Sequence, residues 1–261
     1  MKPNFEFDGE KYKAASKHQK EWGSKIISEL NLSGDEAILD LGCGDGVLTA
    51  QLASLVPHGR VLGIDASEGM IATAKKLESD IVSFQVLDID GIDFTDEFDL
   101  IFSNATLHWI KDHKRLLQHA YEGLKSGGFI RFNFAGDGNC ASFEKVTRAA
   151  ICDIHYQPYF KDFEWPWYTP TVSDYELLVK ESSFTNIRVW PENADRHFSS
   201  PEEMIRWIDQ PSLVPFLMHI PIEEDKKRFR DTVVNRMKEL TLQDDGRCFE
   251  TFRRINVYAR K

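Results

Sequence analysis

The stretch Ala37–Thr49 reads AILDLGCGDGVLT and gives the first indication of the architecture. Its apolar beginning predicts a buried strand, and three alternating glycines then precede a new apolar periodicity. This order predicts a strand, a glycine turn and a helix over about Val47–Leu55. Glycine adopts positive φ and lets a ligand approach the backbone, while the start of a helix offers unpaired N–H groups and a positive dipole end. The turn is therefore expected to bind a ligand.

Two classes of ligand use such a turn, dinucleotides and S-adenosylmethionine (SAM). The dinucleotide motif needs glycine or alanine at the sixth position counted from Gly42, and that position is Val47. Asp40 stands two residues before the first glycine. A carboxylate there is unfavourable beside a pyrophosphate but suits the cationic ammonium of a methionine moiety. The spacing therefore favours SAM over NAD.

The string LDLGCGDG at residues 39–46 resembles the first motif of the class I SAM-dependent methyltransferase family. The resemblance implies an α/β fold with a doubly wound, mostly parallel seven-stranded sheet of Rossmann-like type. It also implies SAM as cofactor and S-adenosylhomocysteine (SAH) as product. Alternating patterns independently predict a parallel doubly wound sheet over residues 36–135. The predicted strands are 60–65, 82–87, 98–102 and 129–134, with a helix at 114–124.

Composition limits the class of partner. The 261 residues carry a formal net charge of −10 and no block of Lys and Arg, which argues against nucleic acid because phosphates need a basic surface. No signal peptide and no apolar run of membrane-spanning length is recognised. The four cysteines form no CxxC pair, so we expect reduced thiols in a cytoplasmic enzyme, without a zinc site or disulfides. A monomer and a homodimer both remain open.

Asp65 ends the second predicted strand, 21 residues after Gly44. An acidic residue at this place accepts hydrogen bonds from ribose hydroxyls. Its alternative role is to cap the next helix, but Ser67 can do this and would leave Asp65 for the ribose. Met70 either packs on adenine or belongs to the core. Asp88 matches the family's acidic residue near the adenine amino group, unless it belongs to a solvated acidic loop.

Carried over from the family, one set of residues would hold the cofactor. The set is Asp40, Gly42, Gly44, Asp65, Ala66, Met70, Asp88, Ile89 and Asn104. Ile89 is placed beside the adenine ring.

The segment Ser103–Ile110 follows the fourth predicted strand and reads SNATLHWI. It lacks the Asn/Asp-Pro-Pro-Tyr/Phe motif typical of enzymes that methylate planar nitrogens. His108 is either a general base or fixes the loop through a hydrogen bond, and a carboxylate nucleophile would need no base at pH 7. In the leading helix, Tyr12, His18 and Gln19 either face a ligand or lie on a solvated surface.

Four stretches together resemble the trans-aconitate and juvenile-hormone-acid methyltransferase branch. They are Tyr12–Gln19, the LDLGCGDG turn, Leu107–Ile110 and Ser200–Glu203. The resemblance implies methyl ester formation on a small-molecule carboxylate, with Gln19 and Trp109 as donors to that carboxylate and His108 lining the cavity. The alternatives are an amine or phenol acceptor with His108 as base, a non-catalytic SAM-binding protein and an NAD-dependent dehydrogenase.

We predict a single methyltransferase domain over residues 1–261. Residues 1–35 form a helical segment and 36–140 the cofactor-binding core. Two insertions, 141–172 and 195–242, are expected to form a lid that excludes water, and packing under a long loop or an oligomer contact is the alternative for their aromatic residues. Predicted helices cover 14–30, 173–181, 201–208, 213–222 and 224–240, and strands cover 186–190 and 250–259, the last antiparallel.

Overall fold

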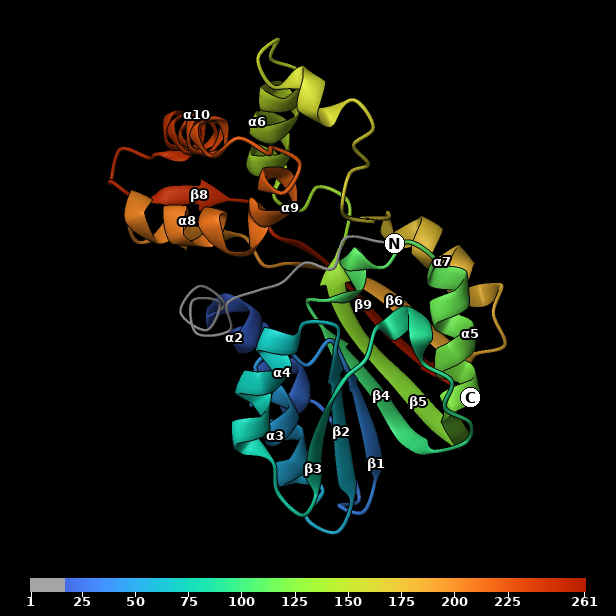
Figure 1. Cartoon of the computed structure of the whole chain (residues 1–261). Helices are drawn as coiled ribbons and strands as arrows, with labels where there is room; N and C mark the ends of the chain where they lie inside the picture. The colour runs from blue at the N-terminus through green and yellow to red at the C-terminus, as the bar shows by residue number, and fades with distance from the viewer. Residues whose placement is uncertain (1–16) are drawn as a thin grey trace. The chain divides into compact units, whose positions relative to one another are not determined.

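The computed structural model describes residues 17–261, which fall into two compact units (Figure 1). The first unit comprises the described residues up to Asp137, Trp167–Glu192 and Arg254–Lys261. The second comprises Gly138–Pro166 and Asn193–Arg253. The two predicted insertions thus share one unit, with somewhat different bounds from those expected, and a lid function for them stays a prediction.

A seven-stranded sheet forms the centre of the first unit, in the order β3-β2-β1-β4-β5-β9-β6. Neighbouring strands from β3 to β5 are parallel, and β9 is antiparallel to β5. The strands are β1 (Ala37–Leu41), β2 (Arg60–Asp65), β3 (Val82–Val86), β4 (Phe98–Asn104), β5 (Leu124–Ala135), β6 (Thr185–Asn193) and β9 (Arg253–Arg260). The predicted doubly wound, mostly parallel sheet with an antiparallel last strand is confirmed.

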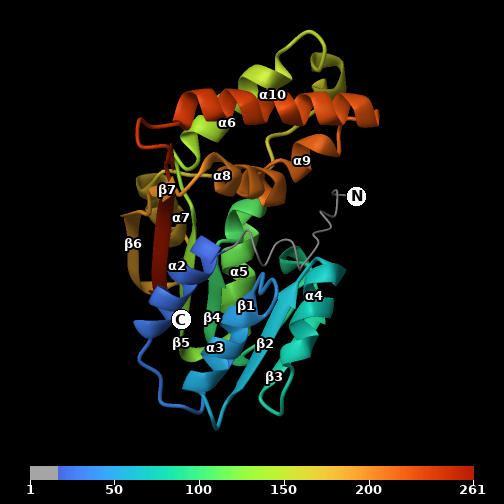
Figure 2. The same cartoon turned by 90° about the vertical axis from the view of Figure 1, so that its left-hand side faces the viewer.

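Helices cover both faces of this sheet. In Figure 1, α2 (Lys17–Ser28), α3 (Val47–Leu55) and α4 (Glu68–Ala74) lie on one face, and α5 (His113–Gly123) and α7 (Val172–Lys180) lie on the other. Figure 2 shows α2 and α3 in front of the strands. Among the helices of residues 17–261, none has the length and apolar composition that crossing a membrane requires.

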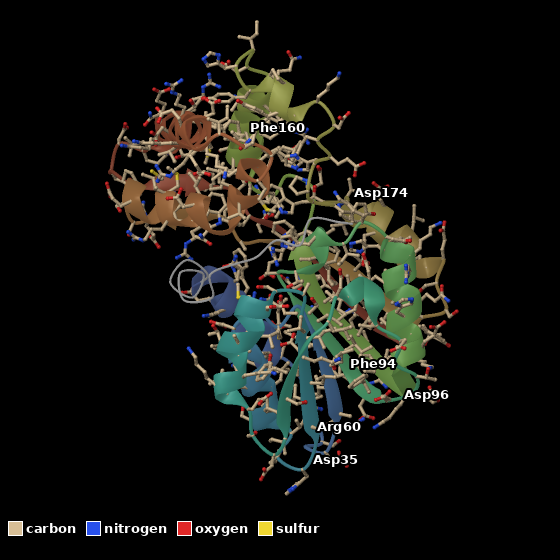
Figure 3. All side chains as sticks on the ribbon, viewed as in Figure 1. Asp35, Arg60, Phe94, Asp96, Phe160 and Asp174 are labelled. Carbon is tan, nitrogen blue, oxygen red and sulfur yellow. The ribbon has the colours of Figure 1, made fainter. Side chains whose placement is uncertain are left out.

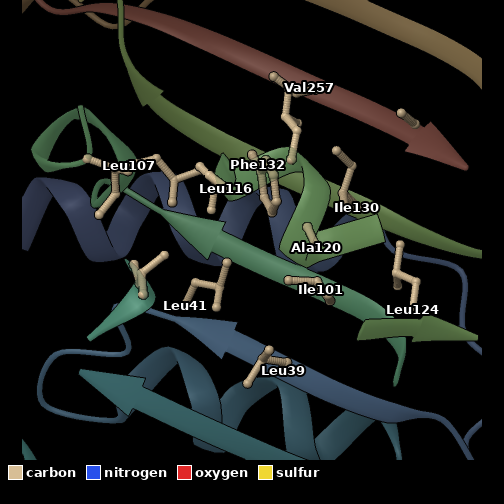
Figure 4. Packing of buried hydrophobic residues seen from close by; sticks show 14 of the residues in the cluster. Leu39, Leu41, Ile101, Leu107, Leu116, Ala120, Leu124, Ile130, Phe132 and Val257 are labelled. Atoms are coloured by element: carbon tan, nitrogen blue, oxygen red, sulfur yellow. The ribbon is translucent and has the colours of Figure 1, made fainter. Parts of the chain in front are cut away.

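The core forms two layers because parallel strands are buried on both faces. All five residues of β1 are buried, including the alternate pair Leu39 and Leu41, which pack with α5 residues such as Leu116 (Figure 4). On the other face, Ile38 packs in one cluster with Ile27 of α2. The apolar run that predicted β1 is thus explained by burial on both sides.

The position of β1 decides where a ligand can bind. This strand pairs with β2 on one side and β4 on the other, so the chain order reverses at β1. Open α/β sheets bind ligands outside the carboxyl ends of the strands at such a switch point. The glycine turn follows β1 at this edge. Asp35 and Arg60, labelled in Figure 3, lie at the opposite, amino edge.

The second unit is helical with a small antiparallel sheet. Its elements are α6 (Ala141–Ile151), α8 (Pro201–Trp207), α9 (Val214–Leu217), α10 (Glu223–Thr241), β7 (Arg196–Phe198) and β8 (Cys248–Glu250). Figure 2 shows α10 beside α6. Its core is aromatic: Phe143, Phe216 and Phe229 are fully buried, and Phe160, labelled in Figure 3, has its ring 5.5 Å from that of Phe229.

Two predictions in this unit are wrong in detail. The helix expected at 213–222 is shortened to α9, which ends at Leu217, and Pro221 lacks the N–H that a longer helix would need. The strand expected at 250–259 is divided, because Cys248–Glu250 pairs with β7 while Arg254–Arg260 pairs with β5. Helix α6 was not predicted, although Phe143, Val146, Thr147 and Ala150 recur at helical spacing and are buried.

Glu250 holds the start of α6. Its buried carboxylate accepts hydrogen bonds from the backbone N–H groups of Ser142 (3.1 Å), Phe143 (2.9 Å) and Thr251 (2.8 Å). The N–H groups of Ser142 and Phe143 would otherwise lie unsatisfied at the start of α6.

We therefore expect Glu250→Ala to lower the free energy of unfolding by about 2–4 kcal/mol, since it leaves buried donors without an acceptor. Chemical denaturation measures this loss. Glu144→Ala, which removes a half-exposed carboxylate of the same helix that pairs with Arg148, serves as the control. Equal effects of the two substitutions would contradict the capping role.

Candidate active site

The glycine turn has the predicted left-handed backbone. Gly42 and Gly44 have φ of 71° and 55°. A Cβ on Gly42 would lie 2.1 Å from Thr106 Cγ2, so this glycine is required for packing of the turn against the segment after β4. A Cβ on Gly44 would meet nothing within 4 Å. Gly44 therefore borders open space that a ligand can occupy.

Asp65 connects the glycine turn to the end of β2. One carboxylate oxygen accepts from Gly44 N at 3.0 Å and the other from Ser67 N at 2.9 Å. Ser67 Oγ in turn accepts from Met70 N and caps α4, as predicted. Asp65 thus contributes to the turn geometry in addition to the expected ligand role. Because a carboxylate oxygen can accept two hydrogen bonds, these contacts leave Asp65 able to accept from ribose hydroxyls as well.

Asp40 is a buried carboxylate beside this turn. It is 2% exposed and accepts one hydrogen bond from Thr49 Oγ1 at 2.7 Å. Burial raises the pKa of Asp40 to about 7. The hydrogen bond from Thr49 lowers this pKa, and the negative charge of Asp65 raises it further. A cation bound next to Asp40 and Asp65 would stabilise both carboxylates.

Helix α2 contacts the same turn. Lys20 Nζ lies 2.6 Å from Asp45 Oδ2, and Asn104 Nδ2 at the end of β4 donates to Gln19 O at 2.9 Å. A Cβ on Gly23 would lie 2.3 Å from Leu48, so the helix approaches α3 closely. The predicted leading helix therefore lies at the turn. Tyr12 lies outside the described residues, and His18 lies in the first turn of α2.

Two buried acceptors lie where α2 meets β4. Gln19 Oε1 and Asn104 Oδ1 are buried and accept no hydrogen bond within residues 17–261. A buried acceptor without a donor costs about 1–3 kcal/mol. Together with the open space at Gly44 and the buried carboxylate of Asp40, these acceptors fit a ligand that brings a cationic N–H group.

The other predicted cofactor residues lie at the ends of β2 and β3, which are neighbouring parallel strands. Ala66 follows Asp65, and Met70 is 3% exposed. Asp88 is exposed, and its Oδ1 accepts from Asp90 N at 3.0 Å to cap the short turn that contains the buried Ile89. These residues share the carboxyl edge of the sheet with the glycine turn.

The Leu107–Trp109 segment forms a single 3-10 turn after β4. Tyr168 N donates to His108 O at 2.8 Å, and the Trp167 ring lies 5.7 Å from the Trp109 ring in an edge-to-face arrangement. The turn is therefore held in place from the segment before α7.

A second contact fixes the same turn. His113 is buried, with Nε2 3.0 Å from Leu107 O and Nδ1 2.9 Å from the Tyr175 hydroxyl. Burial lowers the pKa of His113 to about 4, so the ring is neutral at pH 7 and one tautomer satisfies both contacts.

The electrostatics of His108 argue against a base role. Burial, with the positive charge of Arg254 and repulsion between the protonated rings of His108 and His113 as further causes, lowers the pKa of His108 to about 3. Its buried Nδ1 has no hydrogen-bond partner among residues 17–261. An imidazole with this pKa is a weak base at pH 7.

Arg254 is a site residue that the sequence reading missed. It is 4% exposed, and Nε and Nη2 donate to Asn133 Oδ1 at 2.9 and 2.7 Å. The pairing of Ala135 with Arg254 places this guanidinium at the carboxyl end of β5. The available signal was a pair of arginines, Arg253 and Arg254, at the start of an otherwise apolar strand.

Comparison with known proteins identifies the family of the chain. A family model described as a methyltransferase domain matches residues 38–128. An uncharacterized methyltransferase of Schizosaccharomyces pombe is 30% identical over 245 residues, which cover 90% of each chain. A trans-aconitate 2-methyltransferase of a Mycobacterium species is 26% identical over 238 residues, 90% of this chain and 91% of that one. Another, from Deinococcus radiodurans, is 39% identical over 113 residues, 43% of each chain.

Solved structures share the fold. The YcgJ protein of Bacillus subtilis has a TM-score of 0.61 at 17% identity, covering 93% of this chain and 98% of that one. Phosphoethanolamine N-methyltransferase 2 of Haemonchus contortus, solved in complex with SAM, has a TM-score of 0.58 at 23% identity. The match covers 92% of this chain and 52% of that one. The chain belongs to the class I SAM-dependent methyltransferase family, and its cofactor is SAM.

The open space at Gly44 leads to a test with a matched control. Gly44→Ala and Gly127→Ala each place a Cβ in open space at positive φ, so each should cost about 1–2 kcal/mol of stability. Only Gly44→Ala should weaken SAH binding, by about tenfold or more, because its methyl group occupies the ligand's space. Calorimetric titration measures both affinities. Similar SAH affinities in the two variants would remove Gly44 from the binding site.

The raised pKa of Asp40 leads to a pH dependence. The pKa of Asp40 in the cofactor-free fold lies above its ordinary value of 3.8. This shift stabilises the fold at low pH, where Asp40 is neutral, and the stabilisation is lost as the pH rises to about 7. A cationic ligand favours the ionised form. SAH affinity should therefore fall about tenfold per pH unit below pH 7, with proton release on binding.

Calorimetry at pH 6, 7 and 8 in two buffers of different ionisation enthalpy measures both effects. Asp40→Asn keeps an acceptor for Thr49 and should make SAH affinity weak at all three pH values. A wild-type affinity that does not change over this range would contradict the proposed contact.

Proposed function

We propose that the protein transfers a methyl group from SAM to a carboxylate oxygen of a small molecule and so forms a methyl ester. The observation that carries this proposal is that His108 is weakly basic, because it is buried and lies in the electric field of the buried Arg254. A carboxylate acceptor is already ionised at pH 7 and needs no base, whereas a phenol or an ammonium must first lose a proton.

The cofactor supplies an activated methyl group on a cationic sulfonium. We infer that Asp40, together with the buried acceptors of Gln19 and Asn104, faces its ammonium, and that Asp65 holds its ribose. Gly42 and Gly44 provide the backbone of the turn. The adenine side would be formed by Ala66, Met70, Asp88 and Ile89.

On the acceptor side, the protein must orient an oxygen and exclude water. The amide nitrogen of Gln19, whose oxygen faces the ammonium, and the Trp109 indole N–H are proposed to donate to the carboxylate. These hydrogen bonds should orient the oxygen without strongly stabilising its charge, because that charge disappears in the transition state. The insertions 141–172 and 195–242 are proposed as the lid that keeps water out.

The distribution of charge supports an anionic acceptor. Asp40 and Asp65, proposed for the ammonium and the ribose, lie near the carboxyl ends of β1 and β2, whereas Arg254 lies across the sheet at the carboxyl end of β5. A buried cation raises the local potential and favours a negative ligand. The relatives named trans-aconitate 2-methyltransferase point in the same direction, since the name denotes a small organic acid.

An amine or phenol acceptor is the second candidate, because some relatives of the same fold, such as the Haemonchus enzyme, are N-methyltransferases by name. In that case His108 or another group must remove a proton. The low pKa of His108 counts against this candidate.

Incubation of the protein with methyl-labelled SAM and a panel of small acids, amines and phenols tests the acceptor class. We expect label on acids only, released as methanol by mild alkali, because esters hydrolyse and methylamines and methyl ethers do not. Label that resists alkali on an amine or phenol would overturn the proposal.

The pH profile provides an independent test. Because the pKa of His108 is about 3, the imidazole stays neutral from pH 6 to 9, and kcat at saturating SAM should be flat over this range. His108→Asn should lower kcat less than tenfold, whereas removal of a true general base costs about 10²–10⁴-fold. A kcat that rises with pH and disappears with His108→Asn would identify His108 as the base.

A further inference from the structure

One face of α2 carries a stripe of polar contacts with the sheet. Trp22, Lys25 and Glu29 stand at i, i+3 and i+7, a spacing that places residues on one side of a helix. Trp22 and Lys25 belong to α2, and Glu29 directly follows its last residue. Each contacts a charged residue. The contacts are Trp22 with Arg254 (ring centroid to Cζ 4.7 Å), Lys25 with Glu192 (2.6 Å) and Glu29 with Arg131 (3.5 Å).

Beneath this stripe, polar side chains form a connected network across β5, β9 and β6. Asn133 accepts from Arg254, and Asn133 Nδ2 donates to Asn256 Oδ1 at 2.9 Å. Asn256 Oδ1 also accepts from Arg131 Nη1 at 3.0 Å, and Asn256 Nδ2 donates to Glu192 Oε2 at 3.2 Å. Every member except Glu192 is at most 6% exposed. Buried polar groups are costly unless they are hydrogen-bonded, and these are.

The neighbouring residues of α2 contact the proposed cofactor site. Lys20 pairs with Asp45 in the glycine turn, and the carbonyl of Gln19 accepts from Asn104. A 12-residue helix thus joins the buried network to the turn. A rotation of α2 that broke the contacts of the stripe would also displace Gln19 and Lys20.

Apolar contacts alone would hold the helix less specifically. Ile26 and Ile27 already bury α2 in the apolar cluster on this face of the sheet. Such burial is not directional, whereas an ion pair and a ring stacked on a guanidinium favour one arrangement. Apolar burial therefore attaches α2 to the sheet, and the contacts of the stripe fix the rotation and position of the helix.

We propose that Trp22, Lys25 and Arg254 are positioning residues for cofactor binding, which hold α2 in register over the glycine turn. This inference rests on the cofactor placement proposed above. It adds that contacts of α2 with β9 and β6, on the side of the sheet away from the glycine turn, set the affinity for the cofactor through the helix.

Two disruptive variants, one conservative variant and two matched controls test this. Trp22→Leu removes the aromatic face over Arg254, and Trp22→Phe keeps one. The control Trp190→Leu removes a ring from the same network, because Trp190 lies 4.8 Å from Arg131, but Trp190 belongs to β6 and not to α2. Lys25→Glu places a second negative charge beside Glu192. Its control, Lys114→Glu, makes the same charge reversal beside Glu181, away from α2.

Hydrogen exchange of residues 17–28 in the cofactor-free protein and calorimetry with SAH are the two measurements. Trp22→Leu and Lys25→Glu should each speed exchange in α2 and weaken SAH binding, by about 2- to 30-fold for Trp22→Leu. Trp22→Phe should recover most of the affinity, and both controls should bind SAH as the wild type does.

The inference is overturned if Trp22→Leu and Lys25→Glu bind SAH with wild-type affinity, or if the controls weaken binding equally. Because SAH binding needs no acceptor, a failure to methylate acids would overturn the proposed function and leave this result intact. Loss of SAH binding in Gly44→Ala, with wild-type binding in the α2 variants, would uphold the cofactor placement and reject only the role of the stripe.

Discussion

The glycine turn is organised around a carboxyl group, Asp40, that is buried beside a backbone bend. Asp40 lies in the interior beside Asp65, and its elevated pKa shows that the cofactor-free site disfavours the ionised form. Such burial is costly unless a cation compensates for it. The bend itself needs glycine where Thr106 leaves no room for a side chain. On the proposed cofactor placement, the ammonium and sulfonium of SAM would relieve this electrostatic cost and so link cofactor binding to the stability of the turn.

The opposite side of the sheet edge is organised around positive charge. Arg254 is held by Asn133 and covered by Trp22, and its field adds to burial in lowering the pKa of His108. The two halves of the edge therefore differ in sign, with carboxylates after β1 and β2 and a guanidinium beside β5. This separation suits a reaction in which a cationic donor meets an anionic acceptor, since opposite charges that neutralise each other on reaction need no proton transfer.

Helix α2 belongs to both halves. It contacts the glycine turn through Lys20 and the far strands through Trp22 and Lys25. The segment that precedes the first strand thus depends on residues more than 100 positions away, such as Glu192. The second unit shows the same dependence on a smaller scale, because Glu250 caps a helix that begins at residue 141.

The sequence alone determined the strand, glycine turn and helix at Ala37–Leu55, the cap at Ser67 and the doubly wound order of strands. These features depend on periodicity, glycine conformation and capping, which act between residues a few positions apart. The division of the last predicted strand, the weak basicity of His108 and the role of Arg254 were decided by the tertiary structure. Burial and electrostatic potential are sums over residues distant in the chain, and no local pattern records them.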